Sequence, residues 1–589
     1  MPEFYYTSEK NVQIVIALLK AHGIKNVVAS PGTTNITFMM SIRHDPFFKL
    51  YSAPDERSAA YIACGMAAES GAPVAITCTG ATASRNYSPG LTEAFYRKLP
   101  VLAVTSTQHV GRIGNAIPQV IDRSQLPKDI AKCSILIPSI HSQEDEWAAN
   151  LSANKAILEL FHHGGGPVHI NLETTYSRDF SVQELPAVRV IHRYHDKDKK
   201  PLIPAGKRLG VFIGSHRPWT AEETEALDAF CSSYNAAVFC DLTSNYHGKF
   251  RCDFSLVKGQ IFFYGNDLLP EFLIHIGEVS GGYETYGITH GTAEIWRVNP
   301  DGEIRDTFRK LTAVFEMEES DFFREYSQQT TVRNEYATRC QAYCRKLHRQ
   351  LEEIPDLPFS NLWIARNTAH RLPENSVLHL GILNSLRSWN LLGRIPKSVV
   401  IFSNTGGFGI DGGLSSLLGG SLATPGKLHF CVIGDLAFFY DMNVLGNRHV
   451  SGNLRIMLIN NGNGTEFRNY NHPASIFGEN AGEFIAAEGH YGRKSPELVR
   501  HYAQDLGFEY LTASDKNSYL SVMEHFLSPE AQEKPMLLEV FTDSKNESDA
   551  LYAVESLVKE RVTPLRQLAR QVLSAEVRHK VGNALRRLK

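Results

Sequence analysis

The residues best able to do chemistry lie in the last third of the chain, where polar side chains follow two apolar runs. Gly434 and Asp435 come directly after HFCVI, and Asn460 and Asn461 come after LRIMLI. Runs of this kind between helical segments predict neighbouring parallel strands, whose carboxyl ends share one edge of a sheet. Carboxylate and amide oxygens suit a hard divalent cation, and magnesium usually shares its coordination with phosphates. The sequence therefore predicts a site for a magnesium-bound diphosphate.

A glycine pattern just before this segment offers a different interpretation. Gly407, Gly409 and Gly412 match G-x-G-x-x-G, and Asp435 follows at the distance of a dinucleotide fingerprint. This match keeps a nicotinamide-dependent oxidoreductase as an alternative. The pattern opens deep in the chain, without hydride-transfer residues in view. A single Asp or an Asn pair is most simply a turn or a cap, so it is their combined order that favours the metal site.

The order Gly-Asp followed by Asn-Asn resembles the diphosphate motif of thiamine-diphosphate (ThDP) enzymes of the acetolactate synthase and pyruvate decarboxylase type. Here Leu436 stands in the third position, where the family motif has glycine. The resemblance implies that Gly434, Asp435, Leu436 and Asn461 bind the cofactor. It also implies that Asp435 and the Asn461 side chain bind magnesium, with the backbone carbonyl of Asn463 as a third ligand.

The first third of the chain contains the carboxyl group that such a cofactor needs. ThDP requires a carboxyl group against its aminopyrimidine ring, and the segment DERSAAYIACG resembles the family's turn in which that glutamate, here Glu56, begins a helix. An acid in the first turn of a helix is also favoured by the helix dipole. Beside the second motif, we interpret Glu56 as catalytic.

A closer resemblance is to the menaquinone-pathway branch of this family, the succinyl-enolpyruvyl-hydroxycyclohexene-carboxylate synthases. It rests on four segments, SPGTTN (30–35), DERSA (55–59), GNAIPQVIDR (114–123) and SNTGGFGIDGG (403–413). The resemblance implies that Ile410 lies under the cofactor and that Gln119 reaches the active site. It further implies that Asn86, Ser385 and Gly409 contact the cofactor.

Three positions depart from that branch in a way that bears on the substrate. Thr34, Trp389 and Thr405 stand where the resemblance places arginines that bind substrate carboxylates. Arg387 could replace one of them. The loss of these cations predicts poor binding of dianionic substrates and argues against the menaquinone-pathway reaction itself.

Several residues are candidates for moving protons. Glu466 stands at an apolar position of the family beside the cofactor, although an exposed acid at a helix start is an equally simple interpretation. His109 follows a predicted strand where related enzymes have proton-relay residues, but a lone histidine is more often structural. His162 and His163, before GGGP, are interpreted as a polar pair at a helix end.

Alternating strand and helix patterns must position these groups, and they predict a parallel-sheet α/β fold. Buried strands are expected at 25–30, 72–80, 99–107, 166–173, 208–215, 236–244, 270–278, 293–300, 376–382, 397–404, 427–435, 453–461 and 534–543. We predict three tandem doubly wound domains and a tail. These are a pyrimidine-binding domain (1–190), a central Rossmann-like domain (191–355), a diphosphate-binding domain (356–558) and a basic amphipathic helix (559–589).

Composition limits the partners. The formal net charge of −3 gives no reason to expect nucleic-acid binding, and no long apolar run or leader pattern is evident, so we expect a cytoplasmic protein. The central domain lacks a phosphate-cradling glycine pattern, so no FAD is expected. The basic tail could contact a membrane surface or a partner. Because Glu56 and Asp435 lie in different domains, the resemblance implies a homodimer or a dimer of dimers with active sites at the subunit interface.

The leading hypothesis is an enzyme that uses ThDP and Mg²⁺ to decarboxylate a 2-oxo acid. The acyl carbanion would pass to an acceptor, as in a carboligase, or to a proton, as in a decarboxylase. The alternatives are the nicotinamide-dependent oxidoreductase and a catalytically inactive ThDP-fold regulatory protein. The identities of the donor and the acceptor stay open.

Overall fold

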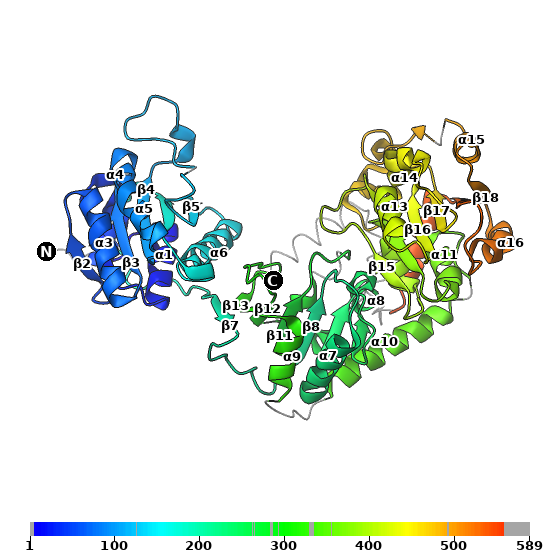
Figure 1. Cartoon of the computed structure of the whole chain (residues 1–589), viewed down its shortest axis with the longest axis horizontal. Helices are drawn as coiled ribbons and strands as arrows, with labels where there is room; N and C mark the ends of the chain where they lie inside the picture. The colour runs from blue at the N-terminus through cyan, green and yellow to red at the C-terminus, as the bar shows by residue number, and fades with distance from the viewer. Residues whose placement is uncertain are drawn as a thin grey trace, which may run out of the picture. The chain divides into compact units, whose positions relative to one another are not determined.

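The computed structural model describes residues 5–558 apart from 125, 262, 264, 283–286, 293, 329–334, 355 and 492–493. Its strands form three sheets of six, seven and six strands, each flanked by helices (Figure 1). The predicted fold of three tandem parallel-sheet α/β units is thus confirmed, while the predicted basic tail, 559–589, lies outside the described residues. Among the described residues no helix combines the length and the apolar character that a membrane span needs.

The first sheet has the strand order β2-β1-β3-β4-β6-β5, and its pairings are parallel. Its elements are β1 (Asn26–Ala29), β2 (Lys49–Ser52), β3 (Val74–Cys78), β4 (Val101–Thr107), β5 (Cys133–Ile137), β6 (Val168–Glu173), α1 (Lys10–Ala21), α2 (Ile36–Arg43), α3 (Glu56–Ser70), α4 (Ala81–Asn86), α5 (Ser88–Tyr96) and α6 (Gln143–Glu159). One apolar core joins the sheet to α1, α2 and α6, and a second joins it to α3 and α5.

Helix α3 shows how local sequence positions a functional side chain. The Asp55 side chain caps it by accepting a hydrogen bond from the Ser58 backbone N–H at 2.7 Å, which places Glu56 in the first turn. Small residues let α3 approach α5 closely, because a Cβ at Gly90 would come within 2.5 Å of Ala60. The helix ends at Gly71, whose φ of 65° is left-handed.

The second sheet has the order β10-β9-β8-β11-β12-β13-β7. Its elements are β7 (His192–His195), β8 (Leu209–Ile213), β9 (Ala237–Cys240), β10 (Arg251–Asp253), β11 (Phe272–Ile276), β12 (Glu294–Val298), β13 (Leu311–Glu316), α7 (Ala221–Tyr234), α8 (Phe254–Lys258), α9 (Glu319–Ser327) and α10 (Tyr336–Glu352). The polar segment 193–207 begins inside β7, and β7 pairs in parallel with β13.

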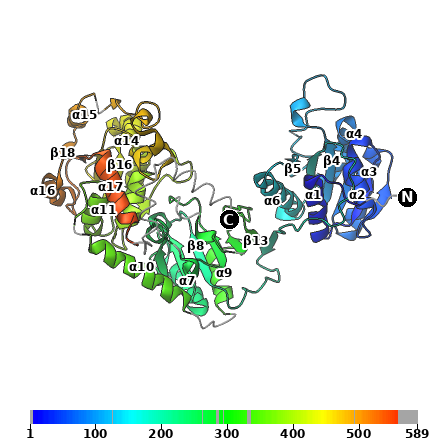
Figure 2. The same ribbon diagram turned by 180° about the vertical axis from the view of Figure 1, so that it is seen from behind.

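The third sheet has the order β15-β14-β16-β17-β19-β18, again with parallel pairings. Its elements are β14 (Val377–Leu380), β15 (Val400–Phe402), β16 (His429–Gly434), β17 (Leu454–Asn460), β18 (Glu509–Ala513), β19 (Met536–Phe541), α11 (Asn361–Thr368), α12 (Asn384–Leu392), α13 (Gly413–Ala423), α14 (Asp435–Asp441), α15 (Leu498–Asp505), α16 (Lys516–Phe526) and α17 (Ser544–Glu555). Figure 2 shows α17 beside α11, where the two helices are in contact.

The chain divides into two compact units. One consists of Met1–Pro201 with Glu294–Met317, and the other of Leu202–Ala293 with Glu318–Lys589. Glu56 belongs to the first unit and Asp435 to the second. The predicted domain boundaries at 190, 355 and 558 stay predictions.

Candidate active site

The Gly-Asp and Asn-Asn segments meet at one edge of the third sheet, as the sequence predicts. Strands β16 and β17 pair in parallel with Gly434 opposite Ile459, so both segments stand at neighbouring carboxyl ends. Asp435 is only 6% exposed and holds both loops. Its Oδ2 accepts a hydrogen bond from the Gly462 N–H at 2.6 Å, and its Oδ1 accepts one from the Leu436 N–H at 2.8 Å.

The loop after β17 is fixed by its own amide side chains. Asn461 is buried, and its Oδ1 accepts a hydrogen bond from the Asn463 N–H at 3.4 Å. The Asn463 Oδ1 accepts hydrogen bonds from the Thr465 hydroxyl at 3.2 Å and the Ser544 hydroxyl at 2.9 Å. These two hydrogen bonds occupy the side-chain oxygen of Asn463. The predicted metal ligand from this residue is its backbone carbonyl.

The residues present fit a magnesium-bound diphosphate. Asp435, Asn461 and Asn463 offer oxygen atoms alone, which is the donor set that magnesium prefers. Helix α14 begins at Asp435, and helix N-termini favour anions. A Cβ built at Gly434, Gly406 or Gly407 would meet no atom within 4 Å, so the backbone at this edge faces open space.

Two buried acids that the sequence analysis missed support this edge. Glu539, fully buried in β19, accepts hydrogen bonds from Asn460 Nδ2 and the Tyr510 hydroxyl, both at 2.7 Å. Burial raises the pKa of Glu539. A charged residue inside the otherwise apolar strand sequence MLLEVF is a signal that could have identified it.

Glu547 in α17 is the second acid. Its carboxylate accepts hydrogen bonds from the Asn361 N–H at 3.0 and 3.1 Å and from the Thr542 hydroxyl at 2.8 Å. Burial raises the pKa of Glu547 to about 7. Asn361 in turn directs its Nδ2 to the Ser385 hydroxyl at 3.5 Å, so Glu547 supports the predicted cofactor residue Ser385 through one intermediate side chain.

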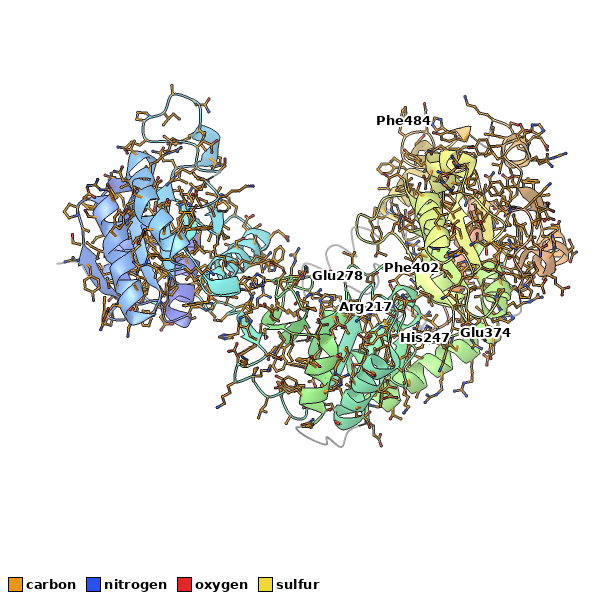
Figure 3. All side chains as sticks on the ribbon, in the orientation of Figure 1. Arg217, His247, Glu278, Glu374, Phe402 and Phe484 are labelled. Carbon is orange, nitrogen blue, oxygen red and sulfur yellow. The ribbon has the colours of Figure 1, made fainter. Side chains whose placement is uncertain are left out.

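Gly409 and Ile410 line a cavity of about 20 Å³ next to β14 and β16, together with Phe402, which is labelled in Figure 3. They lie in the segment 403–412, which separates the end of β15 from the start of α13. A dinucleotide fingerprint requires a tight turn from strand to helix, with the pyrophosphate on the helix N-terminus. This long connection does not provide that turn, so the geometry disfavours the nicotinamide alternative.

Glu466 is held in a part-buried ion pair that the sequence does not reveal. Its Oε2 lies 2.5 Å from Arg387 Nη1 and its Oε1 lies 2.7 Å from Arg387 Nη2, with the two side chains 13% and 15% exposed. The Arg387 Nη1 also donates to Asn384 Oδ1 at 3.2 Å. The pair lines a cavity of about 220 Å³ together with His472 and Tyr552. Glu466 therefore neutralises the arginine that could have bound a substrate carboxylate.

In the first unit, the structure brings Glu56 and Asn86 together. Asn86 Nδ2, at the end of α4, donates a hydrogen bond to Glu56 Oε2 at 3.0 Å. The contact orients the carboxylate at the N-terminus of α3. Two residues that the resemblance assigns to the cofactor site thus form one local group.

Gln119 and His109 stand on the segment that follows β4. Both are exposed, Gln119 with a left-handed φ of 62°, and His109 Nδ1 accepts a hydrogen bond from the Gly111 N–H at 3.1 Å. No hydrogen bond among the described residues joins either of them to Glu56. Their catalytic roles stay predictions.

The loop that carries Gln119 is anchored by a buried arginine that the sequence analysis did not single out. The Arg123 guanidinium donates to Asn171 Oδ1 at 2.8 Å, to Thr105 Oγ1 at 2.9 Å and to the Ser106 carbonyl at 3.1 Å. His169 lies 2.7 Å from the same Thr105 hydroxyl, and burial lowers the pKa of His169 to about 3. A neutral imidazole and a buried cation therefore share this network.

The three positions that lack arginines are all buried. Trp389 is fully buried in α12, while Thr34 and Thr405 are nearly so. Thr34 Oγ1 accepts a hydrogen bond from the Gly80 N–H at 3.0 Å. These side chains add no cation to either part of the site.

Known proteins resemble the chain over most of its length. The family model described as "Thiamine pyrophosphate enzyme, N-terminal TPP binding domain" matches residues 10–126. The 2-succinyl-5-enolpyruvyl-6-hydroxy-3-cyclohexene-1-carboxylate synthase of Phocaeicola vulgatus is 33% identical over 566 residues, which cover 93% of this chain and 98% of that protein. The enzyme of the same name from Bacteroides fragilis is 32% identical over 565 residues, with the same coverage.

A solved structure, the thiamine diphosphate-dependent 4-hydroxybenzoylformate decarboxylase of Rhodococcus jostii RHA1, is 15% identical. It covers 91% of this chain and 99% of its own, with a TM-score of 0.39, which is too low to support an inference. The sequence relatives are much closer, at about a third identity over nearly the whole chain. The chain therefore belongs to the ThDP-dependent enzyme family that includes the 2-succinyl-5-enolpyruvyl-6-hydroxy-3-cyclohexene-1-carboxylate synthases.

Proposed function

We propose that this protein decarboxylates a 2-oxo acid with ThDP and Mg²⁺ and transfers the acyl group to an acceptor or to a proton. The observation that carries the proposal is the buried oxygen site at the carboxyl ends of β16 and β17, where Asp435 holds the loop of Asn461. Family membership supports the cofactor, and the oxygen donor set supports the metal ion.

The chain's own residues divide the work as follows. When bound, ThDP supplies a thiazolium ring that accepts the electron pair left by the departing carbon dioxide. Asp435, Asn461 and the Asn463 carbonyl would hold the magnesium ion. Glu56 takes and returns a proton at the aminopyrimidine ring, and Asn86 keeps the Glu56 carboxylate oriented for that transfer.

The substrate is proposed to carry a single carboxylate. The bidentate partner of Arg387 is the chain's own Glu466, so a second substrate carboxylate would have to displace an ion pair that is mostly shielded from solvent. The Trp389 position is fully buried and uncharged. The relatives are named for a product with a succinyl group. Thr34, Trp389 and Thr405 are uncharged where the resemblance places arginines that bind substrate carboxylates.

The complete site is proposed to form between two subunits of a homodimer or a dimer of dimers. Glu56 belongs to one compact unit and Asp435 to the other, and both must reach one cofactor. If the two parts come from different subunits, mixing Glu56→Gln with Asp435→Ala protein should restore about one active site per mixed dimer. A mixture that stays inactive although mass spectrometry shows exchanged subunits would contradict this arrangement.

The experiment that tests the function is release of carbon dioxide from a panel of monocarboxylic and dicarboxylic 2-oxo acids. Release should require both ThDP and Mg²⁺ and should be lost in Asp435→Ala. The matched control Asp505→Ala changes an exposed acid of the same domain and should keep full activity. Protein that binds ThDP and Mg²⁺ but releases no carbon dioxide from any acid would favour the regulatory alternative instead.

A further inference from the structure

A cluster of two histidines and a glutamate lies in the first compact unit, outside the candidate active site. His162 and His163 follow α6, and Glu316 ends β13. His162 Nε2 lies 3.2 Å from Glu316 Oε2, and His163 Nε2 lies 3.3 Å from Glu316 Oε1. The potential ligand atoms of the three residues all lie within 4.8 Å of one another. This spacing allows one small cation to touch all three.

Two of these atoms are buried and lack hydrogen bonds. The His162 side chain is 2% exposed, and in the described part of the chain neither its Nε2 nor Glu316 Oε2 has a hydrogen-bond partner. Their separation is short, but their geometry does not make a hydrogen bond. Buried polar atoms without partners are uncommon because leaving them unpaired costs free energy. A cation between them would satisfy both.

The orientation of His162 is set by a second carboxylate. Its other ring nitrogen, Nδ1, lies 2.8 Å from Glu159 Oε1, and Glu159 is paired with Arg193 at 3.1 Å and Lys132 at 3.9 Å. A carboxylate on the far nitrogen of an imidazole fixes its tautomer and directs the lone pair of the near nitrogen, as at many metal-binding histidines. The negative charge of Glu159 is balanced by Arg193 and Lys132. Glu316 is therefore the carboxylate whose charge would offset that of the metal ion.

The backbone also holds the ligands in place. His163 has a left-handed φ of 44°, which a non-glycine residue adopts at a cost, and its ring stacks on His162 with centroids 3.7 Å apart. Glu316 lies against Gly302, where a Cβ would come within 2.4 Å of Glu316 Oε2. The strained histidine and the glycine together place both rings on the same carboxylate.

We infer that His162 Nε2, His163 Nε2 and the Glu316 carboxylate form a site for a divalent transition metal ion, with Zn²⁺ as the best match. Two imidazoles and one carboxylate are a frequent zinc ligand set, whereas magnesium prefers oxygen alone. His195 Nδ1 lies 3.3 Å from Glu316 Oε2, so this imidazole or a water molecule would supply the fourth ligand. The metal ion would join the loop after α6 to the end of β13 and stabilise the first unit.

The test uses full-length protein stripped with a chelator and then titrated with zinc chloride against a chromophoric competitor. The wild type should bind one zinc equivalent that persists in Asp435→Ala, because that variant removes only the magnesium site. His163→Ala and Glu316→Gln should weaken zinc binding by about 100-fold or more. The His163 side chain is 63% exposed, so its truncation leaves the packed interior intact.

The matched control is His141→Ala, which removes an exposed imidazole from the same unit and should leave zinc binding unchanged. Cobalt(II) added in place of zinc should give visible absorption that both ligand variants lose. Two results would overturn the inference. The first is that all the zinc bound by the wild type is lost in Asp435→Ala, so that no second zinc site exists. The second is that His163→Ala and Glu316→Gln bind zinc as tightly as the wild type does.

Discussion

Replacing Glu466 with glutamine should change which 2-oxo acids the protein accepts. The Glu466 carboxylate binds both terminal nitrogens of Arg387, at 2.5 and 2.7 Å, in a pair that is mostly shielded from solvent. Glutamine keeps the size of the side chain but removes its charge. Arg387 then loses this bidentate carboxylate partner, and a second substrate carboxylate can take the place of the Glu466 carboxylate.

The magnitude follows from the geometry of that pair. A charge-assisted hydrogen bond contributes about 1.5 to 3 kcal/mol, and a factor of ten in affinity corresponds to about 1.4 kcal/mol. A dicarboxylic 2-oxo acid that takes the place of the Glu466 carboxylate should therefore gain about 10- to 100-fold over a monocarboxylic one. The assay compares kcat/KM for 2-oxoglutarate and pyruvate in the wild type and in Glu466→Gln.

Two variants show whether the gain acts through Arg387. The double variant Glu466→Gln with Arg387→Met should lose it, because the Arg387 guanidinium that would bind the second carboxylate is gone. Glu555→Gln, which alters another acid lining the same cavity, should leave the preference unchanged. If the preference for the dicarboxylic acid stays the same in Glu466→Gln, or rises equally in the double variant, the ion pair does not determine substrate charge.

Two further predictions concern the cofactor edge and the buried acid of α17. Asp435→Ala should lose the rise in melting temperature that ThDP and Mg²⁺ give the wild type, since stabilisation by a ligand requires its binding; an unchanged rise would show that Asp435 is no metal ligand. Glu547 has its pKa raised from 4.5 to about 7, so the folded protein retains a proton that the unfolded chain releases. Its contribution to stability is complete below pH 4.5 and is lost as the pH rises to about 7. Glu547→Gln should remove up to about 3 kcal/mol of this dependence in urea unfolding at pH 5 and pH 8, and an identical difference between the two pH values in both proteins would refute it.

The interior of the fold is predictable from the sequence, and its edges are less so. The strands Val101–Thr107 and Leu454–Asn460 are buried along their whole length, and their apolar runs identify them. The edge strands Lys49–Ser52 and Glu509–Ala513 are largely exposed or half-buried and carry no such run, so the sequence analysis missed them. Strand β7 falls in a charged segment and is recognisable only from its pairing with β13.

The candidate site is also predictable from the sequence only in part. The Gly-Asp and Asn-Asn segments meet as predicted because parallel topology brings consecutive strand ends to one edge. The pair of Arg387 with Glu466 and that of His162 with Glu316 join residues far apart in the sequence. Local spacing holds no signal for such contacts, so their chemistry becomes visible only in the fold.

The most direct test of the central claim measures the cofactor itself and requires no knowledge of the substrate. Protein carrying ThDP and Mg²⁺ is placed in deuterium oxide, and the exchange of the thiazolium C2 proton is followed by rapid acid quench and NMR. We predict that Glu56→Gln still binds ThDP but slows this exchange by about 100-fold or more, because glutamine cannot take up the proton. Equal exchange rates in Glu56→Gln and the wild type, with equal ThDP bound, would contradict it.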